Sequence, residues 1–340
     1  MMKSDLLVAI IGAAHAVGRE VDAALRDRQF PLRACRLFDM VATVAAGEPD
    51  EGDLTGVEDL ASADLGGVEL VFLCADPETA RVWTPKAHKV NARVIDLTGA
   101  FVDEHRVPVV VPEVNPEAVT DDPDAMLFAN PLPGAVALSV VLKPLDDAAT
   151  IKRVVVASYE SASRAGQAGI EELSRQTRDL MNGRSIDTAV FPHRIAFNLI
   201  PQIGTILGDG VSVAERATES QVRRLLDLPE LPITVTSVQV PVFFGEGYAV
   251  NVQTELPLDA VAARAVLREA PGILLLDEPQ SNAYPTAADA LDHEATLVGR
   301  VRDDLSVHYG LNLWVVIDGL RKGSAVNAVQ IAELLLRTKP

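Results

Sequence analysis

Cysteine is scarce in this sequence of 340 residues. Only two occur, Cys35 and Cys74, and each lies in an apolar run that predicts a buried strand. Two isolated cysteines exclude a disulfide framework and a paired-cysteine metal site. We therefore expect no metal, and we expect both thiols to be inert parts of the core.

Positive charge and long apolar runs are also lacking. Lys and Arg number 30 against 48 Asp and Glu, which gives a formal net charge of −18. Nucleic-acid binding requires clustered Lys and Arg, so a nucleic-acid partner is excluded. The apolar stretch near the N-terminus, residues 6–11, is too short for a secretion signal or a membrane span. These features are typical of a cytoplasmic protein without a membrane partner.

The first part of the chain alternates short apolar runs with segments of helical periodicity. The runs that predict strands are residues 6–11, 32–38, 68–74 and 93–97. Continuous apolar strands separated by helices indicate a parallel sheet covered on both faces. We therefore expect an α/β fold whose first domain is a Rossmann-type, doubly wound sheet.

After Pro131 the pattern changes. The runs at residues 151–161, 234–244, 248–256 and 295–302 are longer and partly alternate apolar with polar positions. Alternation is typical of an antiparallel or mixed sheet with one packed face. A helix is expected over residues 165–181, with Gly183 ending it. An amphipathic helix over residues 326–337 could return to the first domain. We expect a first domain of residues 1–131 plus 324–340, and a second, α+β domain of residues 132–323.

A glycine-containing loop follows the first strand, where a dinucleotide-binding turn belongs. The candidate cofactor-binding residues in it are Gly12, Ala13, Ala14, His15, Ala16 and Val17. His15 stands where a middle glycine would let a pyrophosphate approach, although a protonated imidazole could also attract that anion. Both a purely structural turn and a loop that still binds a nucleotide are consistent with this motif.

Several segments in order resemble the aspartate-β-semialdehyde dehydrogenase family, nearly from end to end. They are residues 110–116, 142–145, 151–159, 168–173, 191–201, 284–286 and 312–323. The resemblance implies an NADP-binding first domain and a second domain that forms a homodimer. It also implies a cleft between the two domains in which a small molecule could bind.

The family reaction uses a cysteine thiolate, a histidine acid/base and cations that hold the substrate carboxylate and phosphate. The resemblance places the thiolate in a turn that opens a helix. Here that turn ends in Pro133, a residue suited to the first turn of a helix. The histidine position holds Glu246, and the arginine that holds the substrate carboxylate is replaced by Gln239.

Further positions implied by the resemblance also differ. Glu160 replaces a substrate-facing glutamine, and Val102 replaces an arginine that contacts phosphate. The loop that contacts nicotinamide corresponds to Ser163, Arg164 and Ala165, with Arg164 in place of a glycine. Glu160 and Glu246 would repel an anionic substrate. An ion pair between Glu160 and Arg164 in a disused cleft is favoured over a new catalytic pair of carboxylates.

We interpret the chain as a catalytically degenerate, Usg-type paralogue with a binding or structural role. On this interpretation Pro133, Glu160, Gln239, Glu246 and Val102 are vestigial positions, and NADP binds weakly if it binds. Two alternatives stay open. The first is an active NAD(P)-dependent oxidoreductase with a different substrate, using Glu160, Glu246 or Cys74. The second is an inactive subunit that assembles with an active paralogue.

Overall fold

The computed structural model describes residues 5–40, 56–122 and 124–337. The chain forms two compact units. The first runs to Pro131 and takes up the chain again from Ser324, and the second is Leu132–Gly323. A parallel sheet in the first unit and a mixed sheet in the second confirm the predicted fold class.

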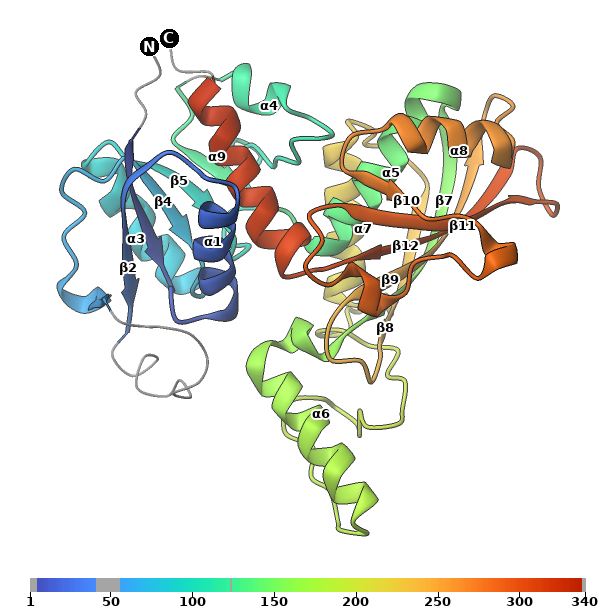
Figure 1. Ribbon diagram of the computed structural model, residues 1–340, viewed down its shortest axis with the longest axis horizontal. Helices are drawn as coiled ribbons and strands as arrows, with labels where there is room; N and C mark the ends of the chain where they lie inside the picture. The colour runs from blue at the N-terminus through green and yellow to red at the C-terminus, as the bar shows by residue number, and fades with distance from the viewer. Residues whose placement is uncertain (1–4, 41–55, 123, 338–340) are drawn as a thin grey trace. The chain divides into compact units, whose positions relative to one another are not determined.

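The first unit is built on six parallel strands in the order β3-β2-β1-β4-β5-β6 (Figure 1). The strands are β1 (Leu6–Ile11), β2 (Leu32–Asp39), β3 (Val57–Asp59), β4 (Leu70–Leu73), β5 (Arg93–Asp96) and β6 (Leu127–Ala129). The helices are α1 (Ala16–Asp27), α3 (Pro77–Lys89), α4 (Glu117–Thr120) and α9 (Asn327–Arg337), with a 3₁₀ turn at Leu60–Ser62. The strands predicted from apolar runs are therefore present, with ends that differ by up to two residues.

Local chemistry fixes where α3 begins. The carboxylate of Asp76 accepts from the amides of Glu78 and Thr79, and Pro77 occupies the first turn of α3.

Helix α9 contacts α1 and contributes apolar side chains to the core of this unit. Arg28 and Glu333 join the two helices, with Nη2 2.8 Å from Oε2.

The second unit is built on six strands in the order β10-β11-β12-β9-β7-β8. The strands are β7 (Ile151–Glu160), β8 (Ile233–Gln239), β9 (Glu246–Thr254), β10 (Ile273–Leu275), β11 (Thr296–Asp304) and β12 (Gly310–Ile317). Two pairs, β7 with β8 and β10 with β11, are parallel, and the remaining pairs are antiparallel. The helices are α5 (Pro133–Ala149), α6 (Gly166–Met181), α7 (Val213–Leu225) and α8 (Ala260–Glu269). Shorter turns are Ala162–Ala165, Pro279–Ser281 and Ala287–Ala290. A π-helical turn at Arg321–Val326 contains the boundary at which the chain returns to the first unit.

The two faces of this second sheet differ. Helices α5, α7 and α8 pack on one face, whereas α6 extends away from the sheet of its own unit (Figure 1). On β9, Val250 and Val252 are buried, and Asn251 and Gln253 are half-buried. This alternation is the one that the sequence predicts. Among the described residues, no α-helix packs on the other face of this sheet.

One predicted strand ends earlier than expected. The run at residues 234–244 was expected to be extended throughout, but β8 ends at Gln239. Pro241 has no N–H to donate to a neighbouring strand, and the side chains of Val242, Phe243 and Phe244 are exposed. Residues 241–245 therefore form a turn that leads into β9.

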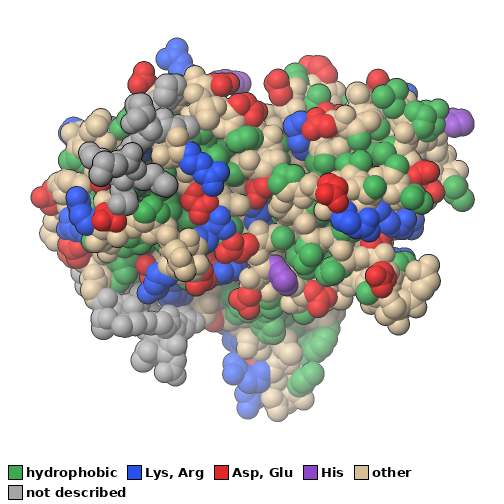
Figure 2. All heavy atoms as spheres, turned by 45° about the horizontal axis from the view of Figure 1, so that its top comes forward, with side chains coloured by type: hydrophobic (Ala, Val, Ile, Leu, Met, Phe, Trp, Pro, Cys, Tyr) green, Lys and Arg blue, Asp and Glu red, His purple; other side chains and the backbone are tan. Residues whose placement is uncertain are grey.

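The surface is of mixed charge. Among the described residues on the face drawn in Figure 2, Lys and Arg side chains lie among Asp and Glu side chains rather than in one continuous basic patch. Within the same described part of the chain, no helix has both the length and the hydropathy needed to cross a membrane.

Candidate functional site

Four positions predicted to be vestigial come together in the second unit. Pro133 begins α5, Glu160 ends β7, Gln239 ends β8 and Glu246 begins β9. Strand β7 pairs with both β8 and β9, and its register places Glu160 opposite Gln239. Positions distant in sequence therefore meet at one end of this sheet.

Pro133 is packed where the resemblance places a nucleophile. A methyl group added to Gly323 would lie 2.6 Å from Cβ of Pro133, so the backbone there approaches the proline ring closely. The amide of Leu132, just before the helix, donates to Oε1 of Gln221 at 2.7 Å. Since proline needs no N–H partner in the first helical turn, helix α5 begins there without strain.

Glu160 is held by its own neighbours. Its Oε2 lies 2.9 Å from Nε of Arg164, and 7% of the Glu160 side chain is exposed against 22% for Arg164. The hydroxyl of Ser158 donates to Oε1 of Glu160 at 2.8 Å. The ion pair that the sequence suggested between Glu160 and Arg164 is therefore present.

Gln239 is engaged with backbone rather than directed at a ligand. Its Nε2 donates to the carbonyl oxygen of Glu160 at 2.8 Å, and its side chain is buried. An amide at this position carries no charge. It therefore cannot replace a guanidinium as the partner of a carboxylate.

Glu246 is the most deeply enclosed carboxyl group of the cluster, with 4% of the residue exposed. Tyr248 donates its hydroxyl to Oε2 of Glu246 at 2.5 Å. Burial and the charge of Glu160 raise the pKa of Glu246 to about 7, against the opposing effect of Arg164. Burial, followed by the charges of Glu246 and Glu160, raises the pKa of Tyr248 well above its ordinary value, so the phenol stays protonated.

The backbone closes over Glu246. A methyl group added to Gly319 would lie 2.6 Å from Oε1 of Glu246 and 3.4 Å from Cβ of Pro133. A carboxyl group with a pKa near 7 has the acidity of a general acid or base. Here the group is buried, one of its oxygens accepts from the Tyr248 hydroxyl, and the other lies close to the backbone at Gly319.

Sequence reasoning missed Tyr248, Ser158 and the glycines at 319 and 323. The first two were detectable from strand periodicity, because Glu246 and Tyr248 on β9, like Ser158 and Glu160 on β7, lie two residues apart and share a face. The glycines carry no local signal, since their role depends on residues far away in sequence.

The predicted nucleotide loop is a tight turn between β1 and α1 in the first unit. Gly12 has φ +94°, a left-handed conformation, and an added methyl group there or at Gly18 would overlap backbone atoms. His15 is exposed, precedes α1 and has φ −74° and ψ 152°, which any residue adopts without strain. A histidine at position 15 is therefore compatible with the tight turn.

The loop amides are only partly engaged. Gly12 and Ala13 donate to the carbonyl of Phe38, at 2.8 and 3.1 Å, while Ala13 and Ala14 are buried. Among the described residues, the amides of Ala16 and Val17 at the start of α1 have no hydrogen-bond acceptor. Such amides suit a phosphate, so the loop retains the donors that a dinucleotide would need.

The remaining candidates belong to both units. Ser163, Arg164 and Ala165 form a 3₁₀ turn in the second unit, where Arg164 is paired with Glu160. Val102 is buried in the first unit.

Neither cysteine is activated. Cys74 is buried directly after β4, and burial raises the pKa of its thiol far above the ordinary value. Burial and the charge of Asp22 raise the pKa of the half-buried Cys35 to about 12. Both thiols therefore stay protonated near neutral pH and are poor nucleophiles.

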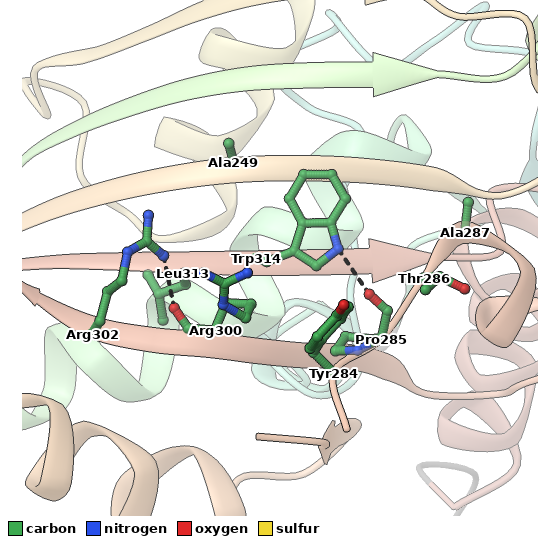
Figure 3. A pocket seen from close by; sticks show the side chains of 9 residues that line it. All are labelled: Ala249, Tyr284, Pro285, Thr286, Ala287, Arg300, Arg302, Leu313 and Trp314. Atoms are coloured by element: carbon green, nitrogen blue, oxygen red, sulfur yellow. Dashed lines mark hydrogen bonds between the residues drawn. The ribbon is translucent and has the colours of Figure 1, made fainter. Parts of the chain in front are cut away.

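A separate cavity of about 420 Å³ lies on the sheet of the second unit, where β9, β11 and β12 run side by side (Figure 3). Its lining consists of Ala249, Tyr284, Pro285, Thr286, Ala287, Arg300, Arg302, Leu313 and Trp314. The indole Nε1 of Trp314 donates to the carbonyl of Pro285 at 3.0 Å, which holds the ring against the strands. Pro133, Glu160, Gln239 and Glu246 are not among the residues that line this cavity.

Comparison with known protein families matches both parts of the chain. The family described as "Semialdehyde dehydrogenase, NAD binding domain" matches residues 7–122, and "Semialdehyde dehydrogenase, dimerisation domain" matches residues 142–322.

Individual relatives match almost the whole chain. The aspartate-semialdehyde dehydrogenase 2 of Vibrio cholerae is 39% identical over 339 residues, covering 99% of each chain. The aspartate-semialdehyde dehydrogenase of Aquifex aeolicus is 38% identical, covering 97% of this chain and 98% of the relative. A crystal structure of aspartate semialdehyde dehydrogenase II from Vibrio cholerae, complexed with ASA, has a TM-score of 0.92 at 38% identity, with 98% of both chains covered.

Proposed function

The chain belongs to the aspartate-semialdehyde dehydrogenase family, and from this premise we propose that it is a catalytically degenerate, Usg-type member with a binding or structural role. The observation that carries the proposal is Pro133. A proline packed against Gly323 occupies the helix start at which the family resemblance puts the cysteine nucleophile. No other thiol replaces it, because both cysteines of the chain have raised pKa values.

The surrounding charges support the same proposal. Acyl transfer through a thioester requires a proton donor and cations for anionic substrate groups. At the corresponding positions this chain holds Glu246, which is buried and accepts from the Tyr248 hydroxyl, and the neutral Gln239. The one cation of the loop, Arg164, is paired with Glu160. A new reaction using Glu160 and Glu246 is less well supported, because both carboxyl groups are enclosed and have partners inside the protein.

We expect no phosphate-dependent reduction of NADP when the purified chain is given aspartate-β-semialdehyde. The reaction lacks its nucleophile at Pro133 and its acid/base at Glu246, and the loss of a general acid or base alone typically costs about 10²–10⁴-fold in rate. The measurement is absorbance of the reduced cofactor at high protein concentration. Turnover above a heat-denatured sample would contradict the proposal.

The same assay on Pro133→Cys tests whether the nucleophile is the only group that the site lacks or whether other groups needed for the reaction are missing too. The new thiol would lie at a helix start, which favours the thiolate, so we expect alkylation without turnover. We expect that only a combined reversal at Pro133, Glu160, Gln239 and Glu246 can restore turnover. The effects of replacing groups that act as a unit are not additive. Measurable turnover from Pro133→Cys alone would show that the rest of the pocket still serves this substrate.

We further propose that the chain is a homodimer. The match of residues 142–322 to a dimerisation domain supports this, as does the sheet face that carries no helical layer in the second unit. Tyr159 and Trp314 pack together on that face with ring centroids 5.7 Å apart, and Ala249 is exposed on the neighbouring strand. Aromatic residues of this kind are enriched in protein interfaces.

Ala249→Asp should therefore convert a dimer into a monomer, because it places a charge in the middle of that face. Light scattering at micromolar concentration is expected to give twice the chain mass for the native protein and one chain mass for the variant. Ala265→Asp, on the exposed side of α8, is the matched control and should remain dimeric. A monomeric native protein, or a dimeric Ala249→Asp, would remove the support for this interface.

A further inference from the structure

Asp39 lies at a distinctive place in the nucleotide-binding unit. It is the last residue of β2, one position beyond the pairing of Ile11 with Phe38. The carboxyl edge of neighbouring strands is where doubly wound sheets bind their ligands. Asp39 is therefore beside the glycine turn that follows β1.

The carboxylate of Asp39 is bonded to that turn. Its Oδ2 accepts from the amide of Ala14 at 2.7 Å, and its Oδ1 accepts from the amide of Met40 at 2.7 Å. Only 2% of the residue is exposed, so bulk water screens its charge poorly. Each carboxylate oxygen keeps a second lone pair, which leaves capacity to accept from a hydroxyl group.

The chemistry of such a position distinguishes the two nicotinamide cofactors. An acidic residue about twenty positions after the glycine turn accepts from the ribose 2′-hydroxyl of NAD, whereas NADP carries a phosphate there and needs a cation nearby. A phosphate and a carboxylate repel each other when they lie as close as a ribose hydroxyl and its hydrogen-bond acceptor.

The sequence that follows Asp39 is acidic. Every charged residue from position 37 to position 80 is Asp or Glu. Arg36, on the same strand, is bound through Nε and Nη2 to both oxygens of Glu58, at 2.8 and 2.6 Å. Asp59 on β3 pairs in register with Asp39 and adds a second carboxylate to this edge.

We propose that Asp39 makes the first unit select NAD over NADP. The amides of Ala16 and Val17 receive the pyrophosphate, and the Asp39 carboxylate accepts from the ribose hydroxyls. This assignment concerns binding alone and does not rest on the absence of turnover. Weak NADP binding then has a specific cause in Asp39, beyond crowding by His15.

Calorimetric titration with NAD and with NADP, without substrate, tests this selectivity. We expect the native protein to bind NAD at least about tenfold more tightly than NADP, as one carboxylate facing a phosphate implies. Asp39→Asn should shift the affinity ratio toward NADP by about tenfold or more. Asp64→Asn, an exposed carboxylate of the same unit, is the charge-matched control and should leave the ratio unchanged within about twofold.

Several results would overturn the assignment. Equal affinities in the native protein, tighter binding of NADP, or no binding of either nucleotide at about 1 mM would each do so. An unchanged ratio in a folded Asp39→Asn would also contradict a role for this carboxylate. If circular dichroism shows that Asp39→Asn does not fold, the native protein is tested instead. The affinities of adenosine 2′-phosphate and of AMP for it are then compared by competition. Tighter binding of adenosine 2′-phosphate than of AMP would contradict the proposal.

Discussion

Replacing Arg164 by Met is expected to lower the free energy of unfolding by about 3–5 kcal/mol at pH 8. The guanidinium faces Glu160 at 2.9 Å, and only 7% of the Glu160 side chain is exposed. Removing the cation leaves a carboxylate enclosed without a charge partner and close to Glu246. Uncompensated buried charge is among the most destabilising changes known in protein interiors. Chemical denaturation at several pH values measures the effect.

The loss should depend on the carboxylates rather than on lost packing. We expect the double variant Glu160→Gln with Arg164→Met to recover most of it, since neither charge then remains. At pH 5 the loss should be smaller, because protonation can neutralise a carboxyl group that has lost its partner. Arg153→Met, an exposed arginine of β7, is the matched control and should cost less than about 1 kcal/mol. A loss equal to that of the control would show that the ion pair contributes nothing to stability.

Replacing Glu246 by Gln is expected to stabilise the protein at alkaline pH and to change little in acid. Burial and the charge of Glu160 raise the pKa of Glu246 from its ordinary 4.5 to about 7. The folded protein thus holds a proton that the unfolded chain releases between these two values. By linkage, the stability that this group contributes is fully present below about pH 4.5 and is lost as the pH rises through 7.

Glutamine resembles the protonated carboxyl and still accepts from the Tyr248 hydroxyl. At ~1.4 kcal/mol per pKa unit, the gain at pH 8.5 should be on the order of 3 kcal/mol, against less than about 1 kcal/mol at pH 5. Thermal and urea unfolding at the two pH values provide the measurement. Glu255→Gln, an exposed glutamate just after β9, should show no such pH dependence. A Glu246→Gln variant that is equally stable or less stable at pH 8.5 would mean that Glu246 is ionised in the native protein at no cost.

Local pattern was sufficient for most of the fold, and its failures have physical causes. The strand from Gly310 to Ile317 was not predicted as a strand, because a short apolar run such as residues 313–317 does not by itself distinguish a buried strand from a buried helix. The strand ending at Gln239 was predicted too long, because a run of apolar side chains does not reveal that Pro241 cannot donate to the ladder.

Chemical identity at single positions is what the sequence alone determined. A proline at 133 carries no nucleophile, a glutamine at 239 no charge, and a glutamate at 246 no imidazole, and no arrangement of the chain alters those facts. The sequence also predicted a parallel sheet from continuous apolar runs and a mixed sheet from alternating runs. The side-chain pattern of a strand shows whether one or both of its faces are buried.

Only the tertiary structure decided which partner each of these side chains has. The pKa of Glu246 near 7 depends on its burial and on Glu160, which lies 86 positions earlier in the chain and is brought near by the pairing of β7 with β9. The close approach of Gly323 to Pro133 likewise joins distant segments. Ionisation and packing depend on distance and solvent access, and these are set by strand register and long-range contacts that no local pattern of residues encodes.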